Sequence, residues 1–253
     1  MPTSIGCPGV DFEGTPRPQG GACDAGADEL GGPAPPPPST ATATITVSAG
    51  GEDGDAERGE AFYPPLTSSP LSVDVSRPSV MVRRSSTPWS YQPVRVGLLR
   101  FDTSGLPDGA IVTSAQLRLH VTGKASSDGR SFVAEWYPGD SWPIDATDWT
   151  LADASSAHAG TPLDVIATGR QTSFGLQNLA SINRTGATAL RLHVSGSATS
   201  PTGANDLAFA SFDQGILPAP TLVVSYEPPS RVGISATPRL AGGPDAISRL
   251  AGV

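Results

Sequence analysis

Residues 98–119 read LLRFDTSGLPDGAIVTSAQLRL, and this stretch decides the fold class. Near its end the apolar residues Ala115, Leu117 and Leu119 alternate with polar ones. A period of two is typical of a strand with one buried face. Between the two apolar segments lies Leu106-Pro107-Asp108-Gly109, in which Pro fixes one φ angle and Gly permits a positive one. The stretch therefore predicts a strand, a turn and a second strand.

Further strand-like segments follow, separated by stretches rich in Gly, Ser, Thr, Asp and Pro. The acidic, Gly-rich stretch Gly50–Glu60 is expected to be a loop, and Gln177–Asn183 is a candidate for a short helix. Many strands with turn signals and no helical period predict an all-β sandwich or barrel. The predicted strands are 42–47, 71–75, 94–101, 115–121, 132–136, 189–194, 207–212 and 221–226.

Charge is distributed unevenly along the 253 residues. Residues 1–60 hold ten acids and two arginines, whereas residues 61–253 hold fourteen acids and fourteen bases. A basic surface for nucleic acid is therefore not expected. No stretch reaches the length of a membrane span, and the N-terminus lacks the pattern of a signal peptide. We expect neither a nucleic-acid partner nor a membrane partner.

Three regions are predicted. Residues 1–39 form an extended, acidic arm rich in Gly and Pro, residues 40–227 the β-sandwich domain, and residues 228–253 a C-terminal tail. The arm has too little apolar surface to offset the entropy of ordering. Its run Pro35–Pro38 predicts a stiff polyproline spacer.

The two cysteines, Cys7 and Cys23, both lie in the arm. A sandwich core linked by disulfides is therefore excluded. A local loop that joins the two thiols and a pair of free thiols both remain open, and the free thiols are slightly favoured.

Residues 115–127 read AQLRLHVTGKASS, and residues 188–200 read TALRLHVSGSATS. We favour two equivalent strands of one domain over a duplicated half-domain. His120 and His193 occupy matching positions, and they could bind a metal if the two strands were neighbours. Outward polar residues of a sandwich explain them equally well, and we expect no metal site.

The region from about Ala41 to Tyr226 resembles the DNRLRE family of β-sandwich domains, which overlaps a class of carbohydrate-binding modules. Residues 98–119 are similar to the strand–turn–strand of that family. The segment Trp142–Trp149 is similar to its paired tryptophans, and Pro220–Tyr226 to its closing strand. The resemblance implies a jelly-roll-like antiparallel β-sandwich. Relatives occur on secreted bacterial surface proteins, beside polysaccharide-acting enzymes and in phage virion proteins.

Acidic residues gather in two segments. Asp140, Asp145, Asp148 and Asp153 surround two tryptophans, where carboxylates could serve glycoside hydrolysis or ligate calcium. The segment Glu52–Glu57 is a second calcium candidate, although a solvated acidic loop is favoured. Because the sequence also lacks a Gly-x-Ser-x-Gly nucleophile elbow, we expect no catalytic residue and no cofactor.

Aromatic side chains are the candidate ligand contacts, because the apolar face of a sugar stacks on a ring. Trp142 and Trp149 are expected to fill the core. Trp89 and Tyr91, in a segment flanked by prolines, are the better candidates for exposure. The candidate glycan contacts are Trp89, Tyr91, Trp136 and Tyr137.

These features favour a non-catalytic structural protein of a phage virion, on the tail or head surface. It would be present in several copies, anchored to other virion subunits through its terminal arms, and could bind a host polysaccharide. Phage proteins leave the cell by lysis and need no signal peptide. The alternative is a carbohydrate-binding module of a secreted or cell-surface bacterial protein. A third hypothesis is a polysaccharide-acting enzyme that uses the aspartates near Trp142.

Overall fold

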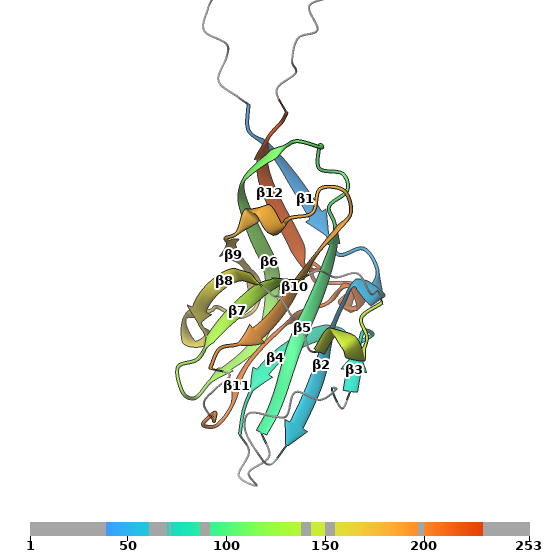
Figure 1. Ribbon diagram of the computed structural model, residues 1–253. Coiled ribbons are helices and arrows are strands. Elements are labelled where there is room, and N and C mark those ends of the chain that lie inside the picture. Colours follow the sequence, from blue (N-terminus) through green and yellow to red (C-terminus); the bar gives the residue numbers. More distant parts are fainter. Residues whose placement is uncertain are drawn as a thin grey trace, which may run out of the picture. The chain divides into compact units, whose positions relative to one another are not determined.

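A computed structural model describes residues 39–60, 70, 72–86, 92–137, 143–149, 155–196 and 200–229. These residues form twelve strands and five short 3-10 helices (Figure 1). The strands are β1 (Ala41–Thr46), β2 (Asp53–Glu60), β3 (Ser72–Asp74), β4 (Ser79–Arg84), β5 (Gln92–Asp102), β6 (Ile111–Ser126), β7 (Ser131–Tyr137), β8 (Ser155–Pro162), β9 (Arg170–Leu176), β10 (Ala187–Val194), β11 (Asn205–Ala210) and β12 (Thr221–Glu227). The 3-10 helices are η1 (Gly50–Glu52), η2 (Ala146–Trp149), η3 (Leu163–Val165), η4 (Leu179–Ser181) and η5 (Phe212–Gln214).

All strand pairings are antiparallel within the described part of the chain. The strand order is β1-β12-β6-β11-β4-β5-β10-β7-β8, with β9 beside β6, β2 beside β5 and β3 beside β2 (Figure 1). The sheet is continuous because β4 and β5 join over two residue pairs, Arg83↔Arg95 and Arg84↔Val94. It is curled so that strands on the two sides of this junction share one core. The predicted all-β class, a jelly-roll-like antiparallel β-sandwich, is confirmed.

Alternation along the strands builds the core. Leu117 and Leu119 of β6 and Leu190 and Leu192 of β10 are all fully buried in it. The strands β6 and β10 do not pair with each other, because β6 pairs with β9, β11 and β12, and β10 with β5 and β7. The similar segments of the two strands therefore supply apolar side chains to one core from opposite sides.

β5 is buried on both faces. Leu99 and Phe101 belong to the main core, whereas Val96 and Leu98 belong to two smaller apolar clusters on the other face. The buried side chain of Trp149 is part of the cluster around Val96. The predicted burial of Trp149 is thus confirmed, while Trp142 lies outside the described residues.

Each predicted strand is present within a few residues at its ends, but β2, β4, β8 and β9 were not predicted. β2 lies within Gly50–Glu60, where a loop was expected, so that prediction is wrong. All eight residues of β2 pair with β5. The long apolar partner imposes a strand on residues of low β propensity. The helix predicted at Gln177–Asn183 contains only the single turn η4.

The chain enters and leaves the sheet at one end, because β1 and β12 pair with Ala41 opposite Tyr226. β6 connects this chain-exit end with the opposite end (Figure 1). Its first residue, Ile111, lies opposite Glu227, and its last, Ser126, lies opposite Asn205. At roughly 3.3 Å per residue, a strand of this length spans about 50 Å. Apart from Ser39 and residues 228–229, the predicted arm and tail lie outside the described residues, as do Cys7 and Cys23.

Candidate functional site

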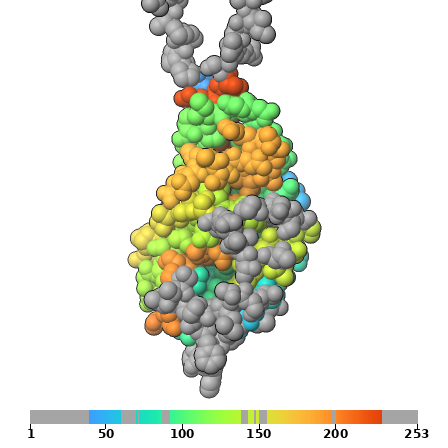
Figure 2. All heavy atoms as spheres, viewed as in Figure 1, coloured from blue at the N-terminus to red at the C-terminus, as the bar shows by residue number. Residues whose placement is uncertain are grey.

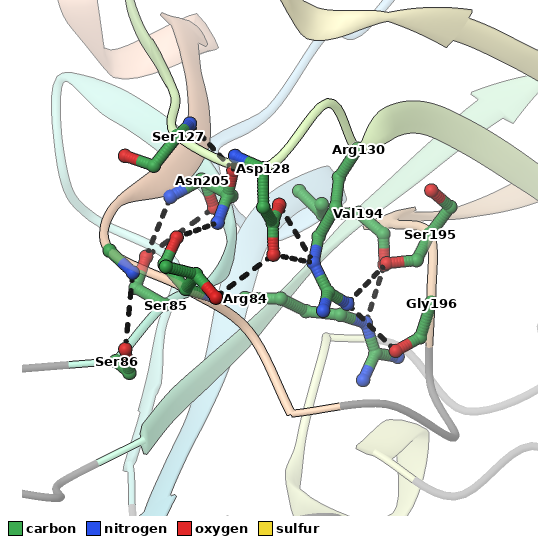
Figure 3. A network of polar contacts seen from close by, with 12 residues as sticks. Arg84, Ser85, Ser86, Ser127, Asp128, Arg130, Val194, Ser195, Gly196 and Asn205 are labelled. Atoms are coloured by element: carbon green, nitrogen blue, oxygen red, sulfur yellow. Dashed lines mark hydrogen bonds and ion pairs between the residues drawn. The ribbon is translucent and has the colours of Figure 1, made fainter.

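Asn205, the first residue of β11, is fully buried, and it pairs with Ser126 at the end of β6 that lies opposite the chain exits. Its contacts are drawn in Figure 3. Its side-chain oxygen accepts hydrogen bonds from the backbone N–H groups of Ser127 and Asp128, at 2.9 and 3.1 Å. Its side-chain amide donates to the carbonyl oxygen of Thr202 at 3.1 Å. One side chain thus holds the turn after β6 against the segment before β11.

Asp128 and Arg130 extend this network from the same turn. The Nε atom of Arg130 lies 3.1 and 2.9 Å from the two carboxylate oxygens of Asp128. Its Nη1 atom donates to the carbonyl oxygens of Ser195 and Gly196, at 3.0 and 2.8 Å. The Asp128 carboxylate also accepts a hydrogen bond from the N–H of Thr202 at 2.9 Å. The buried guanidinium therefore has its counter-charge in place and also fixes the chain after β10.

The end of β4 joins the same network (Figure 3). The hydroxyl of Ser85 accepts a hydrogen bond from the N–H of Asn205 at 3.0 Å. The N–H of Ser86 donates to the carbonyl of Gly203 at 2.9 Å, and its hydroxyl accepts from the N–H of Gly203 at 3.1 Å. Gly203 has a φ of +64°, and a Cβ atom there would lie 2.7 Å from Oγ of Ser127. Glycine is required at this position for its conformation and for its size.

We call residues 84–86, 127–130, 194–196 and 202–205 the polar loop cluster. Its side chains bond mainly to backbone groups of other segments, which fixes four loops against one another. A network of satisfied hydrogen bonds rigidifies its surroundings. The cluster is suited to presenting a fixed surface at this end of the domain.

Two of the candidate glycan contacts, Trp89 and Tyr91, lie outside the described residues. They occur in the sequence between Ser86 and Gln92, both of which are described. Ser86 belongs to the polar loop cluster, so the segment that contains the two rings begins at this cluster.

The expectation that Trp136 and Tyr137 contact a glycan is wrong for this structure, because both side chains are buried. Trp136 is 3% exposed and lies in the main core, where Nε1 donates to the carbonyl of Gln177 at 2.8 Å. Tyr137 is 5% exposed and packs with Leu98 and Ile144 on the other face of the sheet. Neither ring offers a face for stacking. Residues from both faces of the sheet cover β7, which the local sequence does not reveal.

Glu52–Glu57 is neither a calcium loop nor a solvated loop, because most of it belongs to β2. The Asp53 carboxylate is buried and accepts a hydrogen bond from the N–H of Phe212 at 2.7 Å. Burial raises the pKa of Asp53 to about 7; that hydrogen bond opposes the rise, and the charges of Asp213 and Glu52 add to it. A solvated loop would leave such a carboxylate with its ordinary acidity.

Asp55 is buried on the same strand. Its carboxylate accepts a hydrogen bond from the N–H of Met81 at 3.0 Å and lies 3.6 Å from Nη1 of Arg95. Within the described ranges, no group of three His, Cys, Asp or Glu side chains is arranged to hold a metal ion.

Of the four aspartates near the tryptophans, Asp145 and Asp148 are described. Asp148 is buried, and its carboxylate accepts a hydrogen bond from the N–H of Asp145 at 2.9 Å. This contact stabilises the turn of η2 and gives Asp148 a structural role. Asp140 and Asp153 lie outside the described residues.

His120 and His193 do not meet. Their side chains alternate with core residues on β6 and β10, so they point away from the core that lies between these strands. The idea of a shared metal is therefore wrong. Nε2 of His193 lies 3.2 Å from Oε1 of Glu135, and Nη1 of Arg191 lies 3.0 Å from Oε2. These two neighbours lower the pKa of Glu135 to about 2, against the effect of its burial.

A groove lies near the chain-exit end. It consists of two adjoining hollows, of about 460 and 270 Å³, that share Ala180, Ile182 and Arg184. The segment around residue 110 and the segment around residue 180 border it, and their surfaces adjoin in green and orange (Figure 2). Ile111, at one side of the groove, is 63% exposed. This groove combines apolar side chains with an exposed arginine.

No helix in the described part of the chain is long and apolar enough to cross a membrane.

No protein-family model matches this chain, and no curated protein matches it. A chain from the structure of infectious bursal disease virus, Gt strain, is 14% identical over 76% of this chain and 38% of that chain, with a TM-score of 0.27. A chain from the Gx strain is 13% identical over 75% of this chain and 38% of that chain, with a TM-score of 0.23. This chain thus spans well under half the length of either. TM-scores below 0.5 do not establish a common fold, and neither match indicates a function.

Proposed function

We propose that this chain is a non-catalytic structural protein of a phage virion, attached to neighbouring subunits through its terminal segments. The observation that carries the proposal is the pairing of β1 with β12, which brings both chain exits to one end of the domain. An attachment made through both terminal segments would engage this end and leave the polar loop cluster, at the other end of β6, facing outward.

The two ends suit these roles. The chain-exit end offers a groove beside the exposed Ile111, where a partner would remove apolar surface from water. The opposite end has loops held by hydrogen bonds between side chains and backbone groups, which suits a surface exposed on a particle. The resemblance to domains found in phage virion proteins supports the phage assignment.

Particle incorporation tests the proposal. The full chain and a chain that lacks residues 1–39 would be expressed separately during phage assembly, and particles banded in a density gradient would be examined by mass spectrometry. We expect the full chain in the particle band and the shortened chain in the soluble fraction. Circular dichroism of the shortened chain would verify that its sheet is intact. Equal incorporation of both chains would contradict the proposed attachment.

Glycan binding is the second candidate function, either on the virion or as a secreted or cell-surface carbohydrate-binding module. It is favoured by Ser86, the described residue that precedes the segment with Trp89 and Tyr91 in the sequence and that bonds within the polar loop cluster. Retention of the full chain on insoluble polysaccharides would test it. We expect Trp89→Ala or Tyr91→Ala to reduce retention, because each lost stacking contact costs about 1 kcal/mol. The buried Trp136 serves as a contrast, since its replacement would destabilise the fold instead of weakening binding alone.

A further inference from the structure

The groove near the chain-exit end is apolar along its floor. Val112 and Leu179 are partly buried against the main core, and Ile182 is buried in it. Ile111 remains 63% exposed at the side. An occupant that covered these side chains would remove apolar surface from water, which stabilises a complex.

Arg184 gives the groove its charge. It lines both hollows, is exposed, and donates a hydrogen bond from Nη1 to the carbonyl of Ala110. Among the described residues no carboxylate forms an ion pair with Arg184. Of the described residues that line the groove, Asp108 is the acidic one, and it lines only the larger hollow. An occupant that fits the groove would therefore combine apolar side chains with carboxylates.

The N-terminal segment has this composition. Residues 1–38 hold five acids and one arginine, and they include the sequence Val10-Asp11-Phe12-Glu13. In an extended segment, alternate side chains point to opposite sides. Val10 and Phe12 would then enter the apolar floor, and Asp11 and Glu13 would lie along the rim with Arg184.

We propose that this groove binds the acidic segment Val10–Glu13 of a second copy of the chain. The inference rests on the proposed multi-copy assembly and identifies the surface that receives the arm. The intervening residues 14–38 can span about 80 Å when extended, enough to reach a neighbour.

A charge exchange between two full-length variants tests the proposal. One variant carries Arg184→Glu, and the other carries Asp11→Arg with Glu13→Arg. Light scattering over a range of concentrations would measure association of the wild type, of each variant alone and of their equimolar mixture. We expect the wild type to associate and each variant alone to need at least about tenfold higher concentration, because like charges then meet in the groove.

The mixture should recover association. The acidic arm of the first variant meets the unchanged groove of the second, and the basic arm of the second meets the acidic groove of the first. Recovery in the mixture shows contact between copies, since contact within one copy would leave both variants impaired. Failure to recover, or wild-type association by the Arg184→Glu variant alone, would overturn the proposal.

A second pair of variants tests the contribution of the apolar side chains of the groove to association. Ile111→Glu and Val165→Glu both place a carboxylate at exposed positions, 63% and 66% exposed respectively, but Val165 is not part of the groove. We expect weaker association for Ile111→Glu and wild-type association for Val165→Glu. If the wild type were monomeric at all concentrations, the proposed groove contact would be wrong. The proposed function has a separate test: it would be wrong if the full chain did not enter particles.

Discussion

The two ends of this domain are built differently. At the polar loop cluster, Asn205 and Asp128 bond to backbone groups of other loops, so the polar atoms there are satisfied internally. At the chain-exit end, Arg184 and Ile111 are exposed beside hollows. The hollows at the chain-exit end leave Arg184 and Ile111 open to a partner, whereas the loops at the other end are fixed by their own hydrogen bonds. The proposed attachment through the chain-exit end rests on this difference.

The largest expected effect comes from the centre of the polar loop cluster. Asn205→Ala removes three hydrogen bonds made by a fully buried side chain and frees the turn after β6 from the segment before β11. We expect a loss of about 3 kcal/mol in the free energy of unfolding. The matched change is Asn183→Ala at the groove, where the exposed side chain bonds to the backbone and hydroxyl of Thr185. It should cost less than about 1 kcal/mol, as measured by urea denaturation. Equal costs would show that the two ends are similarly ordered.

Two glycines provide the next contrast. Gly203→Ala should cost about 2 kcal/mol, because φ is +64° and the new Cβ atom would meet the side chain of Ser127. Gly105→Ala lies in the turn near the chain exits, where a Cβ atom meets nothing within 4 Å. Its effect should be within about 0.5 kcal/mol. Thermal denaturation of both variants would measure the difference, and a neutral Gly203→Ala would contradict the packing described for the polar loop cluster.

Asp53 lies at the start of β2, away from the polar loop cluster, and gives a smaller, pH-dependent effect. Its pKa is about 7 in the folded state, against 3.8 in the unfolded chain. The folded state therefore binds more protons than the unfolded state between about pH 4 and 7. The stabilisation that this proton binding gives is lost as pH rises through that window. Relative to the Asp53→Asn variant, the free energy of unfolding of the wild type should fall by on the order of 1–2 kcal/mol between pH 5 and pH 8.

The quantity to follow is the difference in the free energy of unfolding between the wild type and Asp53→Asn, because other groups titrate in the same pH range. Burial lowers the pKa of His193, which makes stability rise with pH over part of this window. Denaturant titrations of the wild type and Asp53→Asn at several pH values would separate the two effects. A difference that does not change with pH would contradict the buried, protonated carboxyl.

Local patterns predicted much of the fold and little of the candidate site. Strands with alternating residues, such as Ala115–Val121, were identified because one face of each strand is buried. β2 was missed because its partner β5, and not its own residues, makes it a strand. Asn205 resembles any turn residue in the sequence, since its partner Ser127 lies 78 positions away in the chain. Trp136 and Tyr137 were misjudged because burial on both faces of β7 depends on segments distant in sequence.

The most direct test of the account compares the accessibility of the two ends on intact particles. In a chain with Cys7→Ser and Cys23→Ser, a single cysteine would be placed at Ser200, beside the polar loop cluster, or at Thr185, in the groove. Both residues are exposed in the isolated domain. Maleimide labelling rates would be measured for the free chain and for the particle. We predict unchanged labelling at Ser200→Cys and strong protection at Thr185→Cys. Equal labelling at both positions, or protection at Ser200→Cys alone, would contradict attachment through the chain-exit end.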